Sequence, residues 1–92
     1  MKLTDILKTE ATNRRHIYLF YQKVWLCFGR SALLLHRLYP NIPYRDRDVS
    51  GKGDVLPVMI IDQLTLGDLI ERLPPIQRSE DKMIFELPEY GK

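Results

Sequence analysis

Residues 16–29 limit the fold of this chain more than any other segment. Ten of the twelve residues from 17 to 28 are apolar, and only Gln22-Lys23 interrupts them. Isoleucine, valine and aromatic residues dominate the segment, which favours two strands over a helix. It therefore predicts a β-hairpin with Gln22-Lys23 as its loop, or with a wider or bulged turn, because Gln-Lys lacks the Gly or Asn that a type I′ turn favours. The alternative is one buried helix over residues 14–39, where no proline intervenes.

The predicted loop determines which side chains share a face of the hairpin. A two-residue loop pairs Tyr21 with Val24, Leu19 with Leu26 and Ile17 with Phe28, and these six side chains share one face. The other face then carries His16, Tyr18, Phe20, Trp25 and Cys27. The first face is strongly apolar, whereas the second combines aromatic rings with polar tips.

Helical periodicity predicts a helix on each side of the hairpin. Apolar residues three and four apart predict an amphipathic helix over residues 4–12, with Thr4 as its cap. A second helix is predicted to begin with Ser31 as its cap and to end at Tyr39, because Pro40 follows.

A third helix is predicted around residues 65–73. Thr65 is expected to cap it, with Asp68 completing a capping box and Leu64 packing against Leu69. Pro74-Pro75 ends it.

The remaining segments predict strands and a loop. Val55–Ile61 is typical of a strand, and Pro57 places it at an edge or delays its start. Residues 82–87 predict a final strand, with residues 76–78 as its partner in a hairpin. Residues 40–54 predict a long polar loop and residues 88–92 a tail. We therefore expect a single α+β domain over residues 1–92, in the order α-β-β-α-β-α-β around a mixed sheet.

Composition excludes several classes of protein. The chain has 92 residues, of which 45% are hydrophobic and 28% charged, as in one small globular domain. Its one cysteine excludes an internal disulfide and fits a reducing compartment. No apolar run reaches the roughly 20 residues that span a bilayer, and the first residues lack a signal-peptide core. We expect a cytoplasmic protein that makes no membrane contact.

Charge is divided unevenly along the chain. Residues 1–46 carry eight Lys/Arg and three Asp/Glu, a net charge of +5, whereas residues 47–92 carry six and nine, a net charge of −3. The halves could attract each other within one fold or meet partners of opposite charge.

Residues 46–57 resemble part of a calcium-binding loop. Asp46, Asp48 and Asp54 could supply oxygen ligands, and Gly51 could form the sharp turn. The last position of such a loop needs a bidentate glutamate, but here it is Pro57. We therefore expect no metal site.

His16 and Cys27 share a predicted face of the hairpin and could form a thiol–imidazole pair. The expected register does not oppose them, and no third residue orients the imidazole. A cysteine in a strand commonly acts as a small hydrophobic residue. We expect no enzymatic activity and no cofactor.

The aromatic face is the better candidate for a binding site. Stacking on bases and contact with phosphates would suit the set of Arg14, Arg15, His16, Tyr18, Phe20, Trp25, Arg30 and Arg37. The alternative is that a helix or a second subunit covers this face.

A series of short motifs runs through much of residues 16–87. It consists of Leu19-Phe20-Tyr21, Trp25, Phe28, Ser31-Ala32, Leu34-Leu35, Ile60-Ile61-Asp62, Leu69-Ile70 and Met83-Ile84-Phe85. Their order resembles that in the N-terminal mismatch-recognition domain of the MutS DNA-repair proteins. The resemblance implies a shared architecture and ancestral contact with nucleic acid. The family reads mismatches with a Phe-x-Glu on the hairpin, and the matching positions here are Val24-Trp25-Leu26, so mismatch recognition is not implied.

Two functions follow as expectations. The first is a non-enzymatic interaction module that forms a homodimer or binds a protein partner, with Trp25 near the centre of the interface. Trp25→Ala would then cost about 2 kcal/mol of association energy. The alternative is a nucleic-acid-binding domain that uses the basic half of the chain and the hairpin aromatics.

Overall fold

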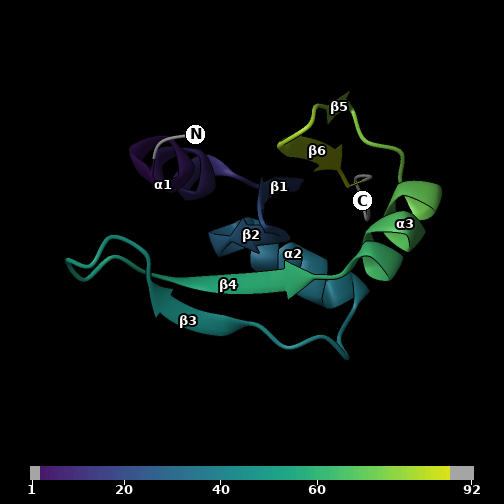
Figure 1. Ribbon diagram of the computed structural model, residues 1–92. Helices are drawn as coiled ribbons and strands as arrows, with labels where there is room; N and C mark the ends of the chain where they lie inside the picture. Colours follow the sequence, from purple (N-terminus) through teal and green to yellow (C-terminus); the bar gives the residue numbers. More distant parts are fainter. Residues whose placement is uncertain (1–2, 88–92) are drawn as a thin grey trace.

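Six antiparallel strands and three helices make up the structure, a computed structural model that describes residues 3–87 (Figure 1). The elements follow in the order α1 (Leu3–Thr12), β1 (His16–Gln22), β2 (Val24–Phe28), α2 (Gly29–Leu38), β3 (Arg45–Asp48), β4 (Val55–Ile61), α3 (Gln63–Arg72), β5 (Gln77–Arg78) and β6 (Lys82–Glu86). The strands lie in the order β3-β4-β2-β1-β6-β5, and all five pairings are antiparallel. The predicted α+β class and element order are confirmed, but the sheet is antiparallel throughout residues 3–87 and not mixed. The predicted tail, residues 88–92, lies outside the described residues.

The predicted hairpin is confirmed, and the single long helix over residues 14–39 is wrong. The register differs from the prediction by one residue, because Lys23 alone separates the strands and Gln22 lies opposite Val24. Lys23 adopts a positive φ of 69°. A two-residue type I′ turn needs two such conformations, which favour Gly or Asn, and Gln-Lys supplies neither. The shift turns Trp25 and Cys27 to the face of Ile17 and Leu19.

The main core lies between this face of the sheet and two helices. The fully buried side chains of β1, Ile17 and Leu19, pack with Leu34 and Leu35 of α2, and the cluster also contains Leu66 and Leu69 of α3. Burial of each such side chain stabilises the fold by about 1.5–3 kcal/mol. The core therefore fixes α2 and α3 on one face.

Helix α1 lies on the opposite face. Ile6 is buried and borders one hollow with Phe20 and another with Phe28. The rings of Phe20 and Phe28 contact each other, with centroids 6.1 Å apart. This small second cluster covers only part of the face.

A buried polar cluster of Glu10, Asn13 and Ser31 joins α1 to the start of α2. The Glu10 carboxylate accepts bonds from the Ser31 amide (2.9 Å), the Ser31 hydroxyl (2.5 Å) and Asn13 Nδ2 (3.1 Å). The Ser31 hydroxyl accepts in turn from the amide of Tyr18, where β1 is no longer paired with β2. Ser31 was expected to cap α2, but the helix begins two residues earlier, at Gly29, and no side chain caps it.

The start of α3 also differs from the prediction by a few residues. Asp62 is the N-cap, and its carboxylate accepts a bond from the Thr65 amide at 2.8 Å. Thr65 lies within the helix, and Leu64 is 85% exposed, so the predicted Thr65 cap and the Leu64–Leu69 contact are wrong. The predicted end before Pro74-Pro75 is confirmed, because the last helical residue is Arg72.

The Asp62 cap makes stability depend on pH. The bond from the Thr65 amide lowers the pKa of Asp62 below its ordinary value of 3.8. The stability that the ionised Asp62 cap adds to the folded state is therefore complete at pH values above 3.8. It is lost as the pH falls through the lower pKa that Asp62 has in the folded state. We expect Asp62→Ala to lower the melting temperature at pH 7 but hardly at pH 2, as circular dichroism can measure. An equal loss at both values would show that the carboxylate does not act as the cap.

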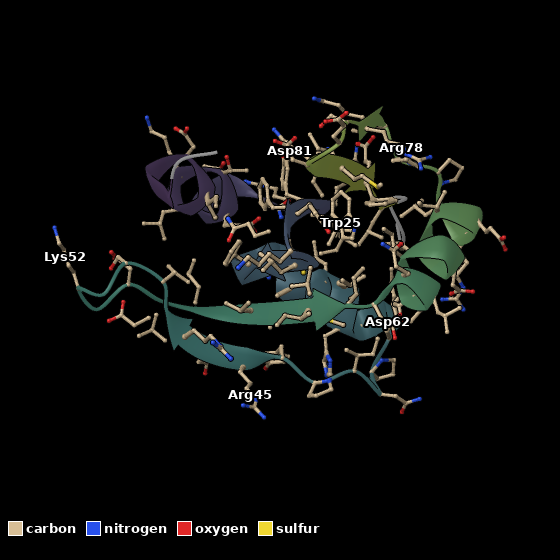
Figure 2. The ribbon with its side chains drawn as sticks, viewed as in Figure 1. Trp25, Arg45, Lys52, Asp62, Arg78 and Asp81 are labelled. Atoms are coloured by element: carbon tan, nitrogen blue, oxygen red, sulfur yellow. The ribbon has the colours of Figure 1, made fainter. Side chains whose placement is uncertain are left out.

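Part of the expected loop 40–54 is a strand. β3 pairs along the first half of β4, with Arg45 opposite Val58 and Asp48 opposite Val55. Pro57 lies beyond the last β2–β4 pair, Phe28 with Val58, so the chain tolerates its missing amide there. The β3–β4 pair extends to a loop with Lys52 at its tip (Figure 2). Asp48 orders this loop by accepting bonds from the amides of Ser50, Gly51 and Gly53.

Candidate functional site

The structure divides the aromatic face that the sequence predicts. Trp25 is only 7% exposed and belongs to the main core with α2 and α3, in the interior of the molecule (Figure 2). It therefore cannot stack on a base or lie at the centre of an interface, and both expectations for this residue are wrong. The cause is the one-residue turn at Lys23. It places each side chain of β2 on the face of the sheet opposite to the predicted one.

His16 and Tyr18 remain together on the other face of β1, with ring centroids 5.9 Å apart. Glu86 of β6 lies close to His16, at 3.7 Å from Nε2, and accepts two bonds from Arg15, at 2.7 and 3.0 Å. Burial, and then the charge of Glu10, raises the pKa of Tyr18. Arg15 is thus engaged with a carboxylate of its own chain.

Three other predicted arginines lie on or near α2. Arg14 and Arg30 border the same hollow at the end of α1. Arg37 follows Arg30 by seven residues on α2, which places both on one side of the helix about 10 Å apart. Phe20, by contrast, is only 5% exposed, because α1 covers it. The predicted set is therefore not one continuous surface.

The predicted thiol–imidazole pair does not form. Cys27 faces the main core, where burial raises the pKa of its thiol, whereas His16 lies on the opposite face of the sheet. Within residues 3–87 no three His, Cys, Asp or Glu side chains are close enough to hold a metal ion. The Asp48 carboxylate, which lies in the segment that resembles part of a calcium-binding loop, accepts backbone bonds, which lower its pKa.

The structure reveals a surface that the sequence interpretation missed, which we call the open groove. Its apolar floor and wall contain Ile6, Leu26, Phe28, Val58 and Ile60, and its charged rim contains Arg45, Arg47 and Asp48. It contains two adjoining hollows of about 420 and 240 Å³, which share Arg47, Val58 and Ile60. Ile60 is 49% exposed and the neighbouring Val24 43%.

The register of β3 explains the rim. Arg45 lies opposite Val58 and Arg47 opposite Leu56, so both arginines are on the face of the groove, and Asp46 alternates with them. Asp48 borders the first hollow at its loop end, where its carboxylate accepts bonds from the loop amides. Both arginines are exposed, and Arg45 projects from β3 into solvent (Figure 2). Neither has an ion-pair partner within residues 3–87. The alternation of Arg and Asp at residues 45–48 is the signal that could have predicted this strand.

Within the part of the chain that the structure describes, no helix has the length and apolar character to cross a membrane. Searches against protein-family models, curated proteins and solved structures gave no match to this chain.

Proposed function

We propose that this chain is a non-enzymatic interaction module that binds another protein, or a second copy of itself, through the open groove. The observation that carries the proposal is the exposed aliphatic surface around Ile60, in a chain whose other face is closed by two helices. A continuous apolar patch rimmed by charge is typical of an interaction site. Its place in the cytoplasm stays a prediction.

The chemistry of the floor favours a protein over a nucleic acid. Base stacking needs exposed aromatic rings, and the groove offers only the half-buried Phe28 among aliphatic side chains. Aliphatic side chains match the apolar side of a protein segment.

Nucleic-acid binding remains the second candidate because Arg14, Arg30 and Arg37 present three cations around α2 without an ion-pair partner among the described residues. The MutS resemblance, still a prediction, points the same way. If this candidate is correct, a labelled single-stranded oligonucleotide should bind with an affinity that falls steeply with salt, and Arg30→Glu should weaken it.

An exposed-surface experiment tests the first proposal. We expect Ile60→Lys to reduce the fluorescence of a bound apolar dye such as anilinonaphthalene sulfonate about threefold, because it places a charge on the floor of the groove. Leu64→Lys is the matched control, since it makes the same change at an exposed leucine on α3. Light scattering over a hundredfold concentration range then distinguishes a self-associating chain from a monomer. Equal dye binding by the two variants, with a constant monomer mass, would contradict the proposal.

A further inference from the structure

We propose that the occupant of the open groove is a single acidic amphipathic helix of a partner protein. This inference rests on the proposed function and names the partner of the same surface.

The width of the uncovered sheet fits one helix. One face of the sheet is covered by α2 and α3. Of the elements between residues 3 and 87, only α1 lies on the other face, where it reaches Phe20 of β1 and Phe28 of β2 through Ile6. A helix with its side chains is roughly 10–12 Å across, or about two spacings between strands. The stretch from β2 through β4 to β3 is two such spacings wide. It is therefore the width of one further helix beside α1.

The two hollows give such a helix its anchor points. Ile6 of α1 borders the first hollow, and Ile42 and Pro43 border the second. Because the hollows share Val58 and Ile60, they are close enough to receive apolar side chains from successive turns of one helix. Helices dock in apolar grooves through side chains at i, i+3 or i+4, and i+7.

The rim indicates the charge of that helix. Arg45 and Arg47 lie on the groove face with no ion-pair partner within residues 3–87, so carboxylates flanking the apolar stripe of a partner would be matched there. A second copy fits less well. Symmetric antiparallel pairing of two β3 edges would place arginine opposite arginine and aspartate opposite aspartate, which is repulsive.

Synthetic peptides can test this inference on the whole chain. One labelled helical peptide carries a leucine stripe flanked by glutamates, and a second carries lysines in place of every glutamate. Fluorescence anisotropy measures the affinity of each. We expect the acidic peptide to bind at least about tenfold more tightly than the basic one, and less tightly as salt rises.

Charge-reversal variants locate the site. The double variant Arg45→Glu/Arg47→Glu should weaken binding of the acidic peptide about tenfold and strengthen that of the basic one. Arg78→Glu is the matched control, because Arg78 is an exposed arginine on β5 at the opposite edge of the sheet (Figure 2) and should leave both affinities unchanged. Ile60→Lys should abolish binding of both peptides.

Each contrary outcome is distinguishable. If Ile60→Lys abolishes binding but peptide charge makes no difference, the groove is an interaction site and the acidic helix is wrong. If the wild-type mass rises with concentration and Ile60→Lys prevents it, the occupant is a second copy. If a single-stranded oligonucleotide displaces the acidic peptide, the surface binds nucleic acid. If neither peptide binds and the dye experiment also fails, the proposed function falls with the inference.

Discussion

Trp25→Ala is expected to destabilise the fold by about 3–5 kcal/mol, because it removes the largest side chain of the main core and leaves a cavity there. Domains of this size have about 5–14 kcal/mol of stability in total, so the variant should be near the limit of folding. Urea unfolding followed by far-ultraviolet circular dichroism measures the loss. Trp25→Phe, which keeps much of the volume, should lose less and supplies a folded reference.

Trp25→Ala also distinguishes a buried core tryptophan, as in the structure, from the interface tryptophan that the sequence predicts. An interface tryptophan would leave the stability of the monomer unchanged and weaken self-association only. Trp25 is the single tryptophan of the chain, so the emission of the native protein reports its surroundings directly. We expect a blue-shifted maximum that moves to the red on unfolding. A stable Trp25→Ala monomer with altered association would contradict the packing described above.

Gly29→Ala is expected to cost about 2–4 kcal/mol for two separate reasons. Gly29 has a φ of +58°, a conformation that costs other residues about 1–2 kcal/mol. An added methyl group would also lie 3.0 Å from Cβ and 3.1 Å from Cγ of Glu10, so Glu10 would have to shift by a few tenths of an ångström.

Gly51→Ala isolates the first of these two effects. Gly51 has a φ of +76°, but an added Cβ meets nothing within 4 Å. We expect it to lose only about 1–2 kcal/mol, again by urea unfolding. If the two alanine variants are equally stable, the close approach of α1 to α2 is not what fixes glycine at position 29.

The sequence predicted the elements better than their register. The apolar run interrupted at Gln22-Lys23 was enough to predict the hairpin, but a turn of one residue rather than two reverses every side chain of β2. Gln-Lys is a poor pair for a type I′ turn, but that alone does not indicate how many residues the turn contains. The position of Trp25, and hence the predicted site, depended on this single residue.

The open groove was missed for related reasons. β3 consists of charged residues only, which are unusual in strands, so its sequence predicts part of a loop. Leu26 and Phe28 were expected on the face of Ile17, whereas they lie on the groove face. A groove formed by strands that are distant along the chain becomes visible only once their pairing is known.

The buried polar cluster has a consequence for how the molecule opens. Along its first half, β1 pairs with β6 on one side, while on the other side the Tyr18 amide bonds to Ser31 and Asn13 bonds to both backbone groups of His16. The same Ser31 is bonded through its amide and hydroxyl to Glu10 of α1, so separating α1 from α2 would leave these buried groups without partners, and each would cost about 1–3 kcal/mol. α1 should therefore not fray independently, as terminal helices commonly do. It should exchange its amide protons together with the central strand, as one cooperative unit.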